Sequence, residues 1–339
     1  MSNKKTRYFV AISGAILAIG LGTGLVASYM GMPVSVFSSA AGPDELQYVP
    51  ADAAVVAYAN VRDVMNSDFR KRFKSMEPSQ DEKNQFEEKT GLNFEQDVDS
   101  VVAAVMPKDN LAKNPAGAFL ILAKARYQPA RLEALAIEHG AQVIEYQGKR
   151  LIVANEKNAA GDAKHDDMAF GFVEADLVAF GSLDSVKASI DAHASNRNIV
   201  SNNDMMKLVN EIDNANAWAV GHFDAIASKA GIPNELAAQM PAITWFSAAG
   251  HVNGGVSGSF KAETKDEATA QNLRDVMRGF LAMAKMQAGN KPGMQQLADS
   301  LVLSGEGNTV ALQFAIPSEV LDVLEGLAKG RHPAQIQQH

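Results

Sequence analysis

The chain has 339 residues, no cysteine and a formal net charge of −8 at pH 7. Without cysteine there can be no disulfide, thiolate zinc site or cysteine nucleophile. The acidic balance, with no basic patch, argues against nucleic acid as a partner. Hydrophobic residues make up 47% of the chain, which is enough for a large folded core.

The N-terminus carries an apolar segment between charged flanks. Residues 8–36 contain no charged side chain, whereas basic residues occur within 1–7 and Asp44 follows. A helix needs roughly 20 apolar residues to cross a bilayer, and basic residues favour the cytoplasmic side. We therefore predict a cytoplasmic tip at 1–7, one transmembrane helix at 8–36, and an extracytoplasmic body after a linker at 37–50.

The same segment also fits a long signal peptide. Secretory signals place small residues at a cleavage site after the apolar region, and residues 38–42 are serine, alanine and glycine. Cleavage there would release the body as a secreted protein. An uncleaved helix predicts instead a homodimer, because Gly20, Gly24 and Ser28 have the spacing of small residues that lets two membrane helices pack closely. The alternative for these residues is that glycine is common in membrane helices.

The first part of the body, residues 51–200, alternates strands with helices. Short runs of β-forming residues predict strands, and apolar residues at helical spacing predict helices. The expected strands are 53–60, 98–106, 118–125, 142–146, 150–154, 169–173 and 177–180, and the expected helices are 81–90, 129–139 and 183–194.

The second part, residues 201–330, repeats this alternation before a flexible tail at 331–339. Its clearest signal is the turn at 253–255, which joins two alternating runs into a hairpin. The expected strands are 217–223, 243–252, 256–261, 301–303 and 310–316, and the expected helices are 202–212, 224–229, 265–287 and 319–328.

The two parts begin with comparable sequences. VVAYANVRDVM starts at Val55 and AWAVGHFDAIA starts at Ala217, and each predicts a strand followed by a helix. We therefore predict an α+β body of antiparallel sheets with helices packed on one face, built from two duplicated halves. The alternative to duplication is coincidence, since α+β proteins reuse these units freely.

The chain contains no G-x-x-x-x-G-K-[ST], H-E-x-x-H or G-x-S-x-G motif, so common signatures of nucleotide-binding enzymes and hydrolases are missing. We expect no cofactor and no catalytic residue. The candidate metal ligands are His222, Asp224 and His251, because two neutral imidazoles on neighbouring strands can share a metal ion with a carboxylate. The simpler explanation is that these histidines are ordinary half-buried polar residues at strand ends.

The helix expected at 265–287 is rich in methionine. Met277, Phe280, Met283 and Met286 lie in it, and flexible thioethers can line an adaptable apolar groove for a peptide or lipid. Such residues also fill cores. Exposure of Met283 and Met286, which lie off the main apolar stripe, would favour the groove.

Two sequence segments near the start of the body resemble those of bacterial single-pass envelope proteins of unassigned function. They are YVPADAAVVAYANVRD at Tyr48–Asp63 and TGLNFEQDVDSV at Thr90–Val101. The resemblance covers the membrane segment and the first part of the body, and its motifs mark strand and turn positions. It implies an inner-membrane protein with a periplasmic body and assigns no functional residue.

These observations predict a membrane-anchored binding or scaffolding protein with a protein, peptide or lipid partner in the envelope. One alternative is an envelope hydrolase or metal-dependent enzyme whose site is assembled from distant residues. Another is a subunit of a larger envelope complex that assembles through its membrane helix.

Overall fold

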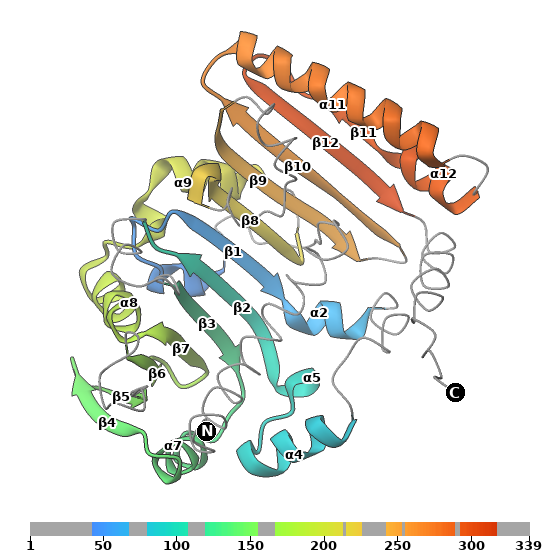
Figure 1. The fold of residues 1–339 in the computed structure, drawn as a ribbon. Coiled ribbons are helices and arrows are strands. Elements are labelled where there is room, and N and C mark those ends of the chain that lie inside the picture. The colour runs from blue at the N-terminus through green and yellow to red at the C-terminus, as the bar shows by residue number, and fades with distance from the viewer. Residues whose placement is uncertain are drawn as a thin grey trace, which may run out of the picture.

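The structure is a computed structural model that describes residues 43–67, 80–107, 119–154, 167–212, 215–225, 242–252, 255–288 and 292–316. These residues form one antiparallel sheet with helices packed against it (Figure 1). The predicted α+β class is therefore confirmed, but the strands make one continuous sheet instead of several.

The sheet has 12 strands. Their bounds are β1 (Val55–Asn60), β2 (Val98–Val105), β3 (Phe119–Ala125), β4 (Gln142–Tyr146), β5 (Lys149–Ala154), β6 (Met168–Phe172), β7 (Leu177–Ser182), β8 (Ala217–His222), β9 (Ile243–Val252), β10 (Val256–Thr264), β11 (Val302–Ser304) and β12 (Thr309–Ile316). The order across the sheet is β11-β12-β10-β9-β8-β1-β2-β3-β7-β6-β5-β4, so β11 and β4 are its edges.

The helices begin at residues that satisfy their free N–H groups. The Ser182 side chain accepts a hydrogen bond from the Ser185 N–H, and the Asn202 side chain accepts one from the Met205 N–H. The helices are α2 (Val61–Asn66), α4 (Gln80–Thr90), α5 (Phe94–Asp97), α7 (Pro129–Glu138), α8 (Leu183–Ser195), α9 (Asn203–Asn210), α11 (Glu267–Ala288) and α12 (Pro292–Ser300), with short 3₁₀ turns η1 (Asp44–Tyr48), η3 (Ile199–Ser201) and η4 (Phe223–Ala225).

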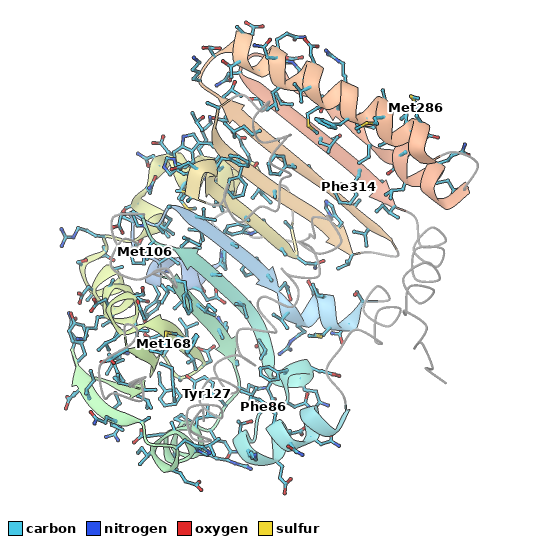
Figure 2. The ribbon with its side chains drawn as sticks, in the orientation of Figure 1. Phe86, Met106, Tyr127, Met168, Met286 and Phe314 are labelled. Atoms are coloured by element: carbon cyan, nitrogen blue, oxygen red, sulfur yellow. The ribbon has the colours of Figure 1, made fainter. Side chains whose placement is uncertain are left out.

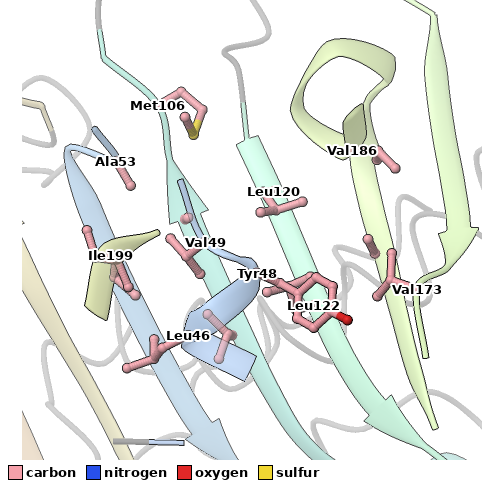
Figure 3. Close-up of a cluster of buried hydrophobic side chains, with 14 of the residues drawn as sticks. Leu46, Tyr48, Val49, Ala53, Met106, Leu120, Leu122, Val173, Val186 and Ile199 are labelled. Atoms are coloured by element: carbon pink, nitrogen blue, oxygen red, sulfur yellow. The ribbon is translucent and has the colours of Figure 1, made fainter. Parts of the chain in front are cut away.

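Side chains of each strand alternate between the two faces of the sheet, which we call face A and face B. Face A carries Val56 and Leu122, which belong to the largest buried cluster (Figure 3). Face B carries Ile121 and Phe180, which belong to a second cluster with Val61 of α2. The sheet is thus the middle layer between two hydrophobic cores.

The prediction that helices pack on one face is wrong. On face A, η1, α8 and α9 contribute Leu46, Val186 and Leu208 to the core. On face B, α5 and α7 contribute Phe94 and Ala136. Strands that are apolar on both sides, such as FLILAKA in β3, must be covered on both faces. In the second half, α9 also covers Trp218 and Val220 of β8 on face A, while α11 and α12 pack on face B.

The predicted linker at 37–50 ends earlier than expected. From Asp44 the chain forms η1, and the side chains of Leu46 and Val49 are 0% exposed. Figure 3 shows both residues packed over β1, β2 and β3. The first turn of the described residues is therefore part of the main core.

The two halves meet at the pair β1 and β8. Ala57 in the middle of β1 pairs with Ala219 in the middle of β8. Each half runs through three neighbouring strands, a helix on face B, and a hairpin whose last strand pairs with the third strand. The elements are β1-β2-β3, α7 and β6-β7 in the first half and β8-β9-β10, α11 and β11-β12 in the second. The first half has the additional hairpin β4-β5.

Several predicted segments lie outside the described residues. These are the tip at 1–7, the transmembrane helix at 8–36 with Gly20, Gly24 and Ser28, most of the helix at 224–229, the helix at 319–328 and the tail at 331–339. Within the ranges that the structure describes, no helix is long and apolar enough to cross a membrane. The helix α12, at Pro292–Ser300, was not predicted.

Candidate functional site

The structure separates the two histidines that were candidate metal ligands. His222, at the end of β8, pairs with Trp245 of β9, and the two rings lie 3.8 Å apart between centroids. His251 lies further along β9, where it pairs with Ser257. At about 3.3 Å per residue, the distance from Trp245 to His251 is about 20 Å. One ion cannot bind both imidazoles across that distance.

Asp224 lies beside His222 in the chain, within the short turn η4. Among the described residues, no group of three or more histidine, cysteine, aspartate or glutamate side chains is arranged to hold a metal ion. The His222 ring instead lies tilted against the Trp245 ring, which is an ordinary contact for an imidazole at a strand end.

A buried hydrogen bond between side chains connects η1 to the sheet. The Ser100 hydroxyl of β2 donates a hydrogen bond to the Glu45 carboxylate, and the two residues are only 6% and 5% exposed. Burial, reinforced by the charges of Glu45 and Asp63, raises the pKa of the nearby Tyr58 to about 12. A serine paired with an enclosed carboxylate lacks both an imidazole base and open access, so this contact is structural.

The outer face of α11 changes character along the helix. Toward its N-terminus the exposed residues are polar, including Gln271, and Asp275 pairs with Arg278. From Gly279 onward the exposed residues include Ala282, Met283 and Met286. We call Gly279, Ala282, Met283 and Met286 the α11 stripe. Their spacing of three and four residues places them on one side of the helix.

The stripe lies where α11 is exposed to solvent, since residues 282–286 are all exposed, Ala284 and Lys285 among them. Met283 is 47% exposed and Met286, on the C-terminal half of α11, is 81% exposed (Figure 2). No atom lies within 4 Å of the position that a Cβ of Gly279 would occupy. Met277, by contrast, packs against the cluster that contains Ala262 and Leu273 of face B, and Phe280 is half-buried. The predicted groove residues therefore divide, with Met277 and Phe280 toward the core and Met283 and Met286 outside.

The N-terminal half of α11 is bound to the sheet by an arginine that no sequence pattern predicted. Arg274 is buried and donates hydrogen bonds to the carbonyl oxygens of Thr309 at 2.8 Å and of Gly307 at 3.4 Å. Its Nε donates to the Gln271 side chain at 3.2 Å. These bonds tie α11 to the turn between β11 and β12, so the stripe is carried on a helix with a fixed position.

Comparisons with known proteins give no family. A scan against protein families finds no match, and a search of curated proteins finds none either. Among solved structures, the chain is similar to TP0453 in its crystal form I, with 11% sequence identity and a TM-score of 0.41. The likeness covers 84% of this chain and 98% of that chain. Similarity at this level carries no functional argument, so the α11 stripe has to be interpreted from its own chemistry.

Proposed function

We propose that this protein is a binding or scaffolding module held at a membrane by its N-terminal segment, and that the α11 stripe is its recognition surface. The observation that carries the proposal is the exposure of Met283 and Met286 on a helix that packs on the sheet through Ala270 and Leu273. Burying a methionine side chain stabilises a complex by roughly 1.5–3 kcal/mol. Flexible thioethers also adapt to apolar partners of different shape.

The start of the body supports a position close to the membrane. Residues 37–43 lie between the apolar segment and the buried turn η1, and even fully extended they span about 25 Å. An anchored segment at 8–36 would therefore hold the body against the bilayer. Confinement of this kind raises the effective concentration of the body for partners on the same membrane.

The position of α11 favours a protein or peptide over a lipid surface as the partner. The turn η1 packs on face A of the sheet, whereas α11 packs on face B through Ala270 and Leu273. A short tether that leads into face A turns face B away from the bilayer. The α11 stripe is then directed toward other proteins of the envelope.

The test is recovery of partners by affinity pull-down of the full-length protein from crosslinked membranes. The double variant Met283→Gln, Met286→Gln is expected to lower recovery of the specific partner at least about tenfold, because that ratio corresponds to about 1.4 kcal/mol. Val200→Gln is the matched control, since Val200 is 43% exposed on η3 and lies outside α11. Equal recovery by the double variant and wild type would refute the assignment of the stripe.

The membrane position is tested separately by carbonate extraction of cell membranes. An uncleaved anchor keeps the full-length chain in the pellet with its N-terminal mass intact. A soluble form that has lost the N-terminal segment would show that the segment is a cleaved signal and that the body is not anchored by it.

We also infer that the two halves arose by duplication. The alignment of Val55 with Ala217 makes Ala57 the counterpart of Ala219, and these two residues pair with each other. Val55 pairs with Gly221, and Ala59 with Ala217, so every pair joins counterparts symmetrically. A one-residue shift would place counterpart side chains on opposite faces. An experimental structure with such a shift at β1 and β8 would contradict the inference.

A further inference from the structure

The strand β4 ends the sheet with an edge that is suited to pairing. Among the described residues, no strand lies beyond it. Its sequence, QVIEY, has no proline or lysine, and its residues pair regularly with β5 without a bulge. Charged residues (lysine above all), proline, bulges and very short strands are the usual protections of an edge, and of these β4 has only the single charge of Glu145. The opposite edge, β11, has such a protection because it is only 3 residues long.

The turn between β4 and β5 fixes which backbone groups of β4 point outward. Gln147 and Gly148 both have positive φ, 46° and 74°, as a two-residue type I′ hairpin turn requires. In such a hairpin, the residues that flank the turn, Tyr146 and Lys149, form a hydrogen-bonded pair. Alternation along the strand then directs the N–H and C=O groups of Val143 and Glu145 away from β5.

These two outward residues are self-complementary about Ile144. If a second copy of β4 approaches in antiparallel orientation, Val143 of each copy lies opposite Glu145 of the other. Their backbone groups can then exchange hydrogen bonds on both sides of a twofold axis through Ile144. We propose that this protein forms a homodimer in which the β4 strands of two copies pair about Ile144 and extend the sheet across both molecules.

The side chains around this axis suit a second copy. The two Ile144 side chains would face each other on face A, where Ile144 already packs against the main core. On face B, each Glu145 would lie opposite Val143 and keep Arg150 as its neighbour within β5, so carboxylates do not lie directly opposite each other. The helix α7, which leads into β4, carries Ile137, 47% exposed.

At the center of the sheet, this chain already forms a symmetric antiparallel strand pair of the same kind. There β1 and β8, which begin the two halves, pair in antiparallel orientation about Ala57 and Ala219. The proposed β4 pair repeats this arrangement between molecules. Its position differs from that of the homodimer predicted from Gly20, Gly24 and Ser28, since it needs no contact between membrane segments.

The test is disulfide crosslinking of single-cysteine variants of the full-length protein in detergent, which is clean because the wild-type chain has no cysteine. In an antiparallel pair that is not hydrogen bonded, the Cα atoms of facing residues lie about 4.5 Å apart, within the range for a disulfide. Ile144→Cys is therefore expected to form disulfide-linked dimers on mild oxidation. Val143→Cys and Glu145→Cys, displaced from the axis, should crosslink much less.

Val302→Cys, at the exposed residue of the other edge, is the control. Dimer formation by Ile144→Cys at least tenfold above this control supports the proposal, and adding Val143→Pro should abolish it. Proline at this position removes an outward N–H and leaves the ladder with β5 intact, so light scattering should show a monomer whose thermal unfolding is nearly unchanged.

Crosslinking of Ile144→Cys no greater than that of Val302→Cys, or equal crosslinking at positions 143, 144 and 145, would overturn the proposal. The crosslink is also expected to survive in the variant Met283→Gln, Met286→Gln. This proposal and the assignment of the α11 stripe can therefore fail independently.

Discussion

The two halves of the sheet share an order of elements, but their third strands, β3 and β10, differ on face A. In the first half, Leu122 of β3 is completely buried under the turn η1. At the matching position of the second half, β10 carries Lys261, whose ammonium lies 3.6 Å from the carboxylate of Glu211. The third strand of each half thus has the same place in the sheet, but β3 is covered on face A whereas β10 carries ionic groups there.

The match between Leu122 and Lys261 follows from the strand registers. Ala57 pairs with Ala103, which pairs with Ile121 of β3. In the second half, Ala219 pairs with Ala248, which pairs with Phe260 of β10. Ile121 and Phe260 are therefore counterparts, and the next residue in each strand is Leu122 or Lys261.

This difference explains why the residues before β1 are packed onto the sheet. Leu120 and Leu122 make face A of the first half apolar, and η1 supplies Leu46 and Val49 to cover them. The corresponding face of β10 bears Ser259 and Lys261, which need no such cover. One topology can therefore place either a buried or an ion-bearing third strand on face A, according to the residues on alternate positions.

The largest expected effect tests this asymmetry directly. Leu122→Ala should lower the free energy of unfolding by about 2–5 kcal/mol, because it leaves a cavity between β3 and η1. Lys261→Ala should change it by less than about 1 kcal/mol, since a surface ion pair contributes little. Chemical denaturation of both variants measures the difference. Similar losses in the two variants would mean that face A is equally buried in both halves.

A second comparison concerns the joint between the halves. Gly221 has φ of +153°, and a Cβ there would lie 2.3 Å from the Ala54 carbonyl oxygen and 2.7 Å from the Val55 Cα. Gly221→Ala should therefore cost about 1–3 kcal/mol of stability through backbone strain. The counterpart change Ala59→Gly should cost only about 0.5–1 kcal/mol. Thermal unfolding of the pair checks this order, and a harmless Gly221→Ala would show that β1 and β8 are not tightly joined.

The smallest expected effect is a pH dependence confined to the first half. Burial and the charge of Glu45 raise the pKa of Tyr58 from 10.0 to about 12, whereas the counterpart of Tyr58 in β8 is Val220, which does not titrate. The folded state holds the phenolic proton more tightly than the unfolded state does. The resulting stability is complete below pH 10 and is lost as the pH rises through about 12.

The variant Tyr58→Phe should therefore lose less thermal stability than wild type between pH 9.5 and 11.5. The measurement is the unfolding temperature across this range. Val220→Ala is a suitable control, because it shortens the counterpart side chain without changing any titrating group. Parallel pH profiles for wild type and Tyr58→Phe would contradict the role of Tyr58.

Local sequence patterns predicted most of the elements. The apolar run at 118–125 is β3, the helical stripe at 265–287 is α11, and the turn at Gln147 and Gly148 closes a hairpin. Each of these signals depends on neighbouring residues and on side-chain periodicity, which a single sequence shows directly.

The missed elements depend on distant contacts. The turn η1 is too short for periodicity to reveal, and it is fixed by packing of Leu46 against strands far along the chain. The error about helices on one face has the same origin. The pattern of β3 shows that both its sides are apolar, but which segments return to cover them is decided by the whole chain.

For the candidate site, too, the sequence predicted what lies within one element, and the tertiary structure decided what depends on several elements. The sequence by itself determined that Met277, Phe280, Met283 and Met286 share one helix and that His222 and His251 belong to strands. Only the tertiary structure decided that Met283 and Met286 face outward while Met277 packs inward, and that strand register keeps the two histidines apart. The physical reason is that periodicity relates residues within one element, whereas exposure and proximity depend on how separate elements pack.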